Sequence, residues 1–177
     1  MKYFAELSYK GTDYFGWQKQ PEHSSVQETL EDGFSTILGK IIDVTGCGRT
    51  DTGVHAKQYF IHFVYNGGFP EGFLRRLNKY IPKDIVVHRI FEVAPDAHAR
   101  YDAYHRSYEY HIERSKNPFS QDFAYYWSFP QNPNFEEMQE AASLLLEYEE
   151  FFPFCKTKSD VKTMKCELKR SEWILED

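Results

Sequence analysis

Long apolar runs and paired cysteines are both missing from this 177-residue sequence. Its three cysteines, Cys47, Cys155 and Cys166, form no C-x-x-C pair, which excludes a disulfide framework and a simple zinc knuckle. No apolar run approaches the length of a transmembrane helix, and Glu6 interrupts the N-terminus too early for a secretory signal. We therefore expect a soluble, cytoplasmic protein that has no contact with membranes.

The sequence also has no excess of positive charge. The sequence has 21 Lys and Arg residues against 27 Asp and Glu residues, a net charge of -6, which argues against a uniformly basic nucleic-acid surface. The imbalance lies mainly in residues 111–177, with 8 basic and 13 acidic side chains, whereas residues 1–110 have 13 and 14. A local basic surface in the N-terminal part therefore stays open as a hypothesis.

Familiar motifs of cofactor and metal chemistry are absent as well. The sequence has no phosphate-binding P-loop, no G-x-G-x-x-G fingerprint and no G-x-S-x-G nucleophile motif. The histidines have no Cys or carboxylate at a metal-ligand interval, which favours structural or surface roles for them. They include His55, His62, His98, His105 and His111. If the chain is an enzyme, a lone carboxylate is the candidate nucleophile.

Apolar periodicity predicts six elements between residues 2 and 93. The strongest is a helix that starts at a capping box of Ser25 and Glu28 and stops at Gly39. A shorter helix is expected with Pro70 at its first position and Pro82 just beyond its end. The predicted strands are 2–9, 41–44, 58–65 and 85–93. The resulting β-α-β-β-α-β order is that of a ferredoxin-like unit.

A second unit is predicted to start after residue 95. A strand over 106–113, a helix capped by Asn134 and a strand over 164–176 repeat only the first three elements. We therefore expect an α+β fold with domains 1–95 and 96–177. Two ferredoxin-like units would join into one continuous antiparallel sheet with helices on one face. The second unit is incomplete, so we expect C-terminal residues to be missing from this chain.

The densest cluster of unusual residues is the glycine-rich stretch from Thr45 to Ala56. Its glycines allow conformations closed to other residues, and Arg49 and Asp51 place opposite charges two positions apart. Two interpretations stay open on these residues alone. Asp51 either caps an ordinary tight turn with Arg49 in solvent, or it is the isolated carboxylate of an active site.

This stretch, Gly48-Arg49-Thr50-Asp51-Thr52-Gly53-Val54-His55-Ala56, resembles the signature of the TruA family of tRNA pseudouridine synthases. The similarity extends through further blocks in the same order along the chain. They are Tyr9-Lys10-Gly11-Thr12, Phe15-Gly16-Trp17-Gln18, Val26-Gln27-Glu28, Ala99-Arg100, Arg106-Ser107-Tyr108-Glu109-Tyr110, and Phe154-Cys155-Lys156 with Cys166 and Trp173. The departures at Cys47, Thr52 and Ala97 do not touch the aspartate.

The resemblance implies that Asp51 is the catalyst of uridine isomerisation in the anticodon arm of tRNA, at positions 38 to 40. Asp51 would attack C1′, add to C6 or abstract a proton, with no cofactor and no metal. The target uridine must be flipped out of its stack. Arg49 would stabilise the vacated place and contact the phosphate, and Tyr108 would stack on the flipped base.

The family also implies a homodimer and a further C-terminal arginine that pairs with the aspartate. Candidate contacts to the RNA backbone are the basic residues Lys10, Lys19, Lys57, Arg75, Arg76, Lys79, Arg100 and Arg106. Two alternatives remain. Tyr108 could be a core residue that shares a strand face with Tyr110, and the chain could be a non-catalytic RNA-binding module related to RRM domains.

Overall fold

The computed structural model describes residues 1–129, 131–154 and 163–176. It divides into two compact units, residues 1–126 and 127–177. The described chain is a mixed fold with a four-stranded antiparallel sheet and three α-helices, in agreement with the predicted α+β class. The predicted domain boundary at residue 95 stays a prediction. Cys155 and Lys156, from the last family block, lie outside the described residues.

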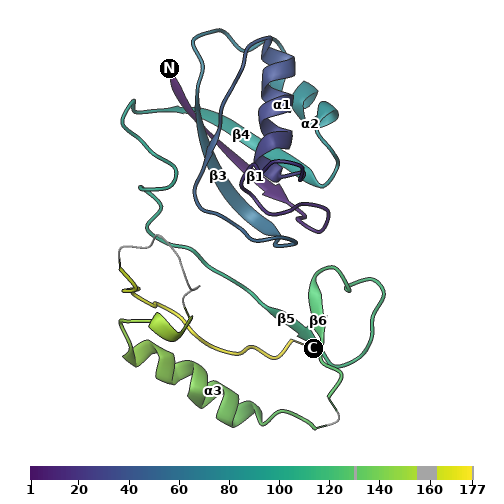
Figure 1. Cartoon of the computed structure of the whole chain (residues 1–177), viewed down its shortest axis with the longest axis vertical. Helices are drawn as coiled ribbons and strands as arrows, with labels where there is room; N and C mark the ends of the chain where they lie inside the picture. Colours follow the sequence, from purple (N-terminus) through teal and green to yellow (C-terminus); the bar gives the residue numbers. More distant parts are fainter. Residues whose placement is uncertain (130, 155–162, 177) are drawn as a thin grey trace. The chain divides into compact units, whose positions relative to one another are not determined.

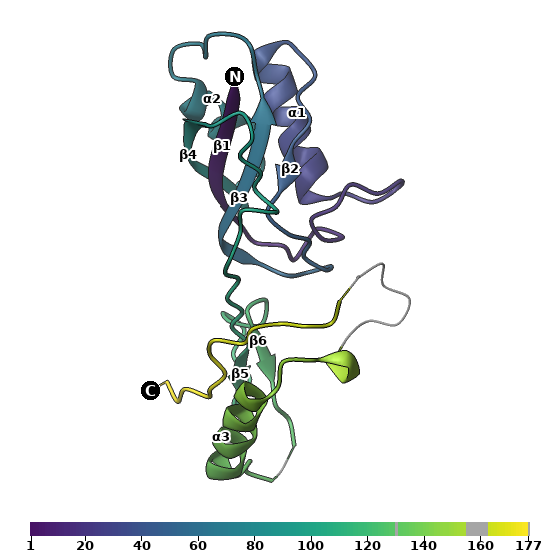
Figure 2. The same cartoon turned by 90° about the vertical axis from the view of Figure 1, so that its left-hand side faces the viewer.

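The main sheet contains four strands in the order β2-β3-β1-β4, all antiparallel. Figure 1 labels three of them, and Figure 2 labels all four. The strands are β1 (Lys2–Tyr9), β2 (Thr45–Gly46), β3 (Ala56–Val64) and β4 (Ile85–Val93). Helices α1 (Val26–Leu38) and α2 (Phe73–Tyr80) lie on the same face of this sheet (Figures 1 and 2). The chain order β1-α1-β2-β3-α2-β4 confirms the predicted alternation of elements.

Helix α1 has the ends that its sequence predicts. The Ser25 side chain accepts a hydrogen bond from the backbone N–H of Glu28 at 3.2 Å, and so satisfies one of the free donors of the first turn. At the other end Gly39 adopts the left-handed conformation with φ of 66°, which other residues adopt at a cost. The helix boundaries were therefore determined by local sequence.

Helix α2 starts three residues later than predicted. The N–H of Phe73 donates to the carbonyl of Pro70 at 3.0 Å, and Gly72 has a positive φ of 66°. Pro70 therefore belongs to a turn before the helix, and Gly72, which tolerates this φ, is the N-cap. The predicted stop before Pro82 is confirmed, because the helix ends at Tyr80.

The short strand β2 lies just after the apolar run 41–44 that was predicted to form it. Within that run, Ile42 and Val44 are buried, but their backbone groups bond to side chains of α1. The N–H of Ile42 donates to Ser35 Oγ at 2.9 Å, and the N–H of Val44 donates to Glu31 Oε1 at 3.2 Å. These bonds replace strand pairing, which begins only at Thr45.

The core of the N-terminal part lies between the sheet and its two helices. Every second residue of β1 is buried, as the alternation predicts. From α1, Phe34 is completely buried, with its ring centroid 4.8 Å from that of Phe63 and 5.8 Å from that of Phe73. Each such side chain contributes roughly 1.5 to 3 kcal/mol by burial. The loop that carries Asp51 therefore leaves a firmly packed sheet.

The chain after β4 departs further from the prediction. Only His111–Glu113 (β5) of the predicted strand 106–113 is formed, and β5 pairs in parallel with Ala124–Tyr126 (β6), a strand that was not predicted. In the described residues this pair is a separate two-stranded sheet. The predicted continuous sheet is therefore not confirmed.

The second compact unit contains helix α3 (Phe135–Leu144) and the short 3-10 helices η1 (Leu145–Glu147) and η2 (Phe152–Phe154). The predicted cap is confirmed, since Asn134 accepts from the N–H groups of Glu136 and Glu137 at 3.1 and 3.4 Å. The predicted strand 164–176 is wrong for its described residues, which form a single bridge between Lys165 and Glu150. One bridge without a continuing ladder does not make a strand. Across the described ranges no helix is long and apolar enough to cross a membrane.

Candidate active site

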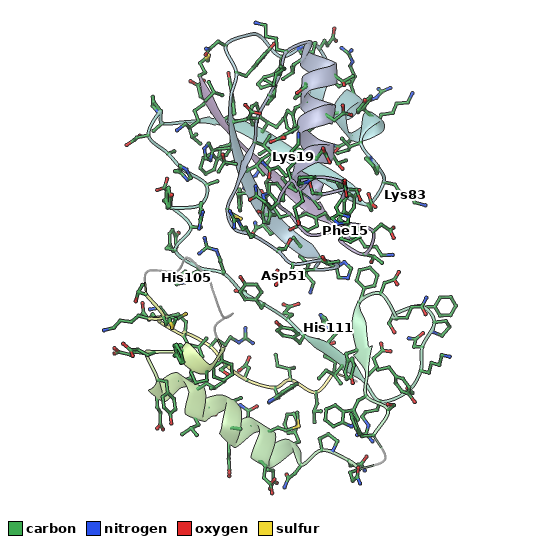
Figure 3. All side chains as sticks on the ribbon, in the orientation of Figure 1. Phe15, Lys19, Asp51, Lys83, His105 and His111 are labelled. Carbon is green, nitrogen blue, oxygen red and sulfur yellow. The ribbon has the colours of Figure 1, made fainter. Side chains whose placement is uncertain are left out.

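Asp51 lies in the loop between β2 and β3, at one end of the four-stranded sheet (Figure 3). Its side chain and that of Arg49 are both exposed. Within the described part of the chain, neither side chain forms a hydrogen bond or an ion pair. Asp51 does use its backbone carbonyl, which accepts from the N–H of Val54 at 3.2 Å and closes the turn. The carboxylate itself is thus presented to solvent.

The segment around Gly16 supports this loop through backbone contacts. The N–H of Trp17 donates to the carbonyl of Thr50 at 3.0 Å. Gly16 has a φ of 86°, and a Cβ atom at this position would lie 2.4 Å from the same carbonyl oxygen. Gly11 makes a similar approach, since its Cβ would lie 2.1 Å from the carbonyl oxygen of Val54. The two glycines of the N-terminal block are therefore needed for close contact with the aspartate loop.

Two buried tyrosines hold the loop from the sheet side. Tyr9, on β1, shares a hydrogen bond of 2.9 Å with Thr50 Oγ1. Tyr59, on β3, donates to the carbonyl of Gly48, and its hydroxyl also accepts from the N–H of Gly48 at 3.4 Å. Burial raises the pKa of Tyr9 to about 12 and also raises the pKa of Tyr59. Both hydroxyls therefore stay protonated and serve as fixed hydrogen-bonding groups.

His55 has a structural role in the same loop. Its Nδ1 accepts from the N–H of Gly11 at 3.0 Å, and its Nε2 lies within hydrogen-bond distance of the carbonyl of Asp122. Since an amide N–H can only donate and a carbonyl can only accept, Nδ1 is the acceptor and Nε2 the donor in these two bonds. Lys10 pairs with the Asp122 carboxylate at 2.6 Å. His55 and Lys10 therefore link the aspartate loop to the segment before β6.

Tyr108 lies in the irregular segment before β5 and is 69% exposed. Its neighbours Tyr110 and Ile112 are exposed as well. The alternative that Tyr108 is a core residue is therefore wrong for this structure. An exposed aromatic face is available to stack on a base.

Several of the candidate RNA-backbone residues have protein partners. Lys57 pairs with Glu109, and Lys19 lies 3.6 Å from Glu31. Surface ion pairs of this kind are weak and exchange readily. The three basic residues of α2, Arg75, Arg76 and Lys79, are exposed on the helix face of the sheet. Arg100 lies over the ring of Tyr101, and Arg106 bonds to backbone carbonyls.

The sheet face opposite the helices tests the alternative of an RRM-like module. Such modules stack bases on exposed aromatics of the central strands. Here Glu6, at the middle of the central strand β1, accepts hydrogen bonds from Gln58 at 2.7 Å and Arg89 at 2.5 Å. These bonds lower the pKa of Glu6, and the charge of Arg89 offsets that of the carboxylate. The rings of Phe4 and Phe91 lie on the same face with their centroids 6.1 Å apart. The charge of this face therefore does not distinguish an RRM-like module from an enzyme.

The described residues assemble no group of metal ligands. Across the described ranges, no three His, Cys, Asp or Glu side chains lie close enough to hold an ion together. The expectation that the site uses neither metal nor cofactor stays a prediction.

Comparison with known protein families gives the enzyme class. The model of the family described as tRNA pseudouridine synthase matches residues 5–102, which contain most of β1, all of β2 to β4 and the Asp51 loop. The chain therefore belongs to the tRNA pseudouridine synthase family, whose members are isomerases. The predicted family relationship is confirmed.

Curated relatives named tRNA pseudouridine synthase A support the same family. The protein of Bacteroides fragilis is 43% identical over 99% of this chain and 70% of its own length. The protein of Bacteroides thetaiotaomicron is 43% identical over 97% of this chain and 64% of its own length. A relative from Clostridium perfringens, named tRNA pseudouridine synthase A 2, is 36% identical over 89% of this chain and 65% of its own length. This chain thus spans about two thirds of the length of these relatives.

Proposed function

We propose that this chain carries the catalytic loop of an enzyme that isomerises uridine to pseudouridine in the anticodon arm of tRNA, at positions 38 to 40. The observation that carries the proposal is the placement of Asp51. Its carboxylate is exposed on a turn that Gly16, Tyr9 and Tyr59 hold rigidly. A fixed, accessible nucleophile next to a flipped base is what this reaction needs.

The chemistry balances without a co-reactant. The bond between uracil N1 and ribose C1′ breaks, the base turns, and a bond forms between C5 and C1′. C5 loses its proton and N1 gains one, so nothing is oxidised or reduced. Asp51 either forms a transient covalent bond at C1′ or C6, or removes a proton.

Arg49 and Tyr108 are the proposed partners of Asp51. Arg49 is exposed two residues before the aspartate, which favours contact with the phosphate of the flipped nucleotide. Tyr108 offers an exposed ring for stacking, worth roughly 1 to 3 kcal/mol per base. We propose that six other basic residues contact the RNA backbone more weakly than Arg49 does. They are Lys10, Lys19, Lys57, Arg75, Arg76 and Arg100.

Two further proposals concern the architecture. The strand order β2-β3-β1-β4 with both helices on one face supports a ferredoxin-like unit in residues 1–95. We also propose that the protein acts in the cytoplasm as a homodimer. A dimer would share the RNA between two subunits, which would help a chain with a net charge of -6 to bind a polyanion.

The test of the catalytic assignment is Asp51→Asn, which keeps the size of the side chain and removes the carboxylate. Tritium release from tRNA that contains uridine tritiated at C5 reports the reaction directly. We expect turnover to be lost while affinity for tRNA stays within a few-fold. Asp43→Asn is the matched control, since Asp43 is another exposed aspartate of the same unit, just before β2. Substantial turnover by Asp51→Asn would overturn the assignment.

Tyr108 is tested with two substitutions in the same assay. If its ring acts by stacking, Tyr108→Phe keeps binding and turnover, whereas Tyr108→Ala weakens binding by roughly 5- to 150-fold, from the stacking range above. A turnover defect in Tyr108→Phe at unchanged affinity would instead assign the hydroxyl to proton transfer. Wild-type activity in both variants would remove Tyr108 from the site.

A further inference from the structure

The Arg106 side chain connects the aspartate loop to the segment that carries Tyr108. Its Nη2 donates to the carbonyl of Cys47 at 2.7 Å and to the carbonyl of Arg100 at 3.2 Å. Its Nη1 lies 3.5 Å from the carbonyl of Ala103. One guanidinium therefore holds a carbonyl just before the Asp51 turn and the backbone that leads to Tyr108.

The next carbonyl of the loop is held from the opposite side. Tyr59 bonds to both the N–H and the carbonyl of Gly48. The arrangement is tight, because a Cβ atom on Gly48 would lie 3.4 Å from Nε of Arg106. On Gly46 a Cβ atom would lie 2.2 Å from the Tyr59 hydroxyl. Two successive carbonyls, those of Cys47 and Gly48, are thus both occupied immediately before Arg49.

We propose that Arg106 is a positioning residue that sets the distance between Asp51 and Tyr108, and not a contact to the RNA backbone. This inference rests on the proposed function, since it assigns a role within that site. The geometry favours it because the two close donor contacts of Nη2 are already directed to protein carbonyls. A phosphate contact that uses Nη2 would have to break these bonds.

The two roles predict different results for a conservative change. A phosphate contact depends on charge, so Lys would replace Arg well. The bonds from Arg106 to the carbonyls of Cys47 and Arg100, which we call the Arg106 bracket, link two backbone segments. They depend on the planar fork of guanidinium donors, which Lys does not provide. Arg106→Lys and Arg106→Gln therefore separate charge from geometry. Arg89→Lys and Arg89→Gln are matched controls, because Arg89 is an exposed arginine of β4 whose side chain pairs with Glu6 rather than with the aspartate loop.

The experiment measures kcat, KM and the salt dependence of tRNA affinity for these four variants. We expect both Arg106 variants to lose kcat by roughly 10- to 100-fold, as for a small misplacement of reacting groups. Their KM and their salt slope should stay within error of wild type. If Arg106→Lys keeps wild-type kcat, while Arg106→Gln raises KM and reduces the salt slope by about 0.7 to 0.9, the proposal is wrong.

Hydrogen exchange of the Gly48 amide gives a readout that is independent of activity. Loss of the bracket should speed exchange at Gly48 in both Arg106 variants but not in the Arg89 variants. Unchanged exchange at Gly48 would overturn the positioning role of Arg106, even if kcat of the Arg106 variants falls. If the wild-type protein, tested with any further C-terminal residues of its natural sequence, releases no tritium, the proposed function fails. Faster exchange at Gly48 in the Arg106 variants would still support the positioning role of Arg106. Should Arg106→Gln not fold, Arg106→Lys gives the same comparison.

Discussion

The two compact units both contain an amphipathic helix, yet only the N-terminal unit buries one extensively. Helix α1 buries Val26, Leu30, Gly33 and Phe34, whereas α3 buries only Ala142. Among the described residues of 127–177, no other residue is buried. Because burial of apolar surface is the dominant favourable term in folding, most of the stability seen here lies in the unit that carries Asp51.

This difference has a consequence for catalysis. The Asp51 loop is anchored by backbone and tyrosine contacts to the packed sheet of its own unit. Tyr108 belongs to the same N-terminal unit, but none of residues 101–113 around it is buried. The loop of the proposed catalytic carboxylate is therefore held by several contacts, whereas the Tyr108 segment depends on single contacts such as those of Arg106.

The largest expected effect on stability comes from shortening a side chain in the core of the N-terminal unit. Phe34→Ala should lower the free energy of unfolding by about 3 to 5 kcal/mol, because Phe34 is fully buried between Phe63 and Phe73. Phe152→Ala is the control, since Phe152 is 71% exposed, and it should change stability by less than about 0.5 kcal/mol. Urea unfolding measures both. Equal losses would contradict the proposed concentration of stability in the N-terminal unit.

A second, smaller effect concerns the support of the aspartate loop. Gly16→Ala combines a positive φ with a clash at the carbonyl of Thr50, and should cost about 2 to 4 kcal/mol and reduce turnover. Gly39→Ala shares the positive φ but meets nothing within 4 Å, so it should cost only about 1 kcal/mol and leave turnover unchanged. Thermal unfolding and tritium release distinguish the two. Normal turnover by folded Gly16→Ala would show that the loop does not depend on this contact.

The smallest expected effect is a pH dependence that only the N-terminal tyrosines should produce. Burial raises the pKa of Tyr9 to about 12 and raises those of Tyr14 and Tyr59. Above pH 10 the folded state therefore binds more protons than the unfolded state, and stability falls as pH rises from about 10 through 12. Urea unfolding across this range should show a smaller fall for Tyr59→Phe. Tyr148→Phe, at an exposed position of the second unit, should match wild type.

Local signals in the sequence determined the elements whose causes lie within a few residues. Ser25 and Gly39 define α1 because caps act on the nearest backbone groups, and alternation in β1 defines its buried face. The glycine-rich motif and its companion blocks predicted the family, which the comparisons confirmed. The roles of Asp51, Arg49 and Tyr108 stay predictions.

Only the tertiary structure decided the features that join residues far apart in the chain. Side chains of α1 hold the run 41–44 away from the sheet, and Gly16 and Tyr59 brace the Asp51 loop from distant strands and turns. Arg106 appears in the sequence as one more basic residue, but the fold places its guanidinium on two carbonyls. Pattern and propensity report on neighbours along the chain, whereas these bonds depend on which backbone groups the packed fold leaves within reach.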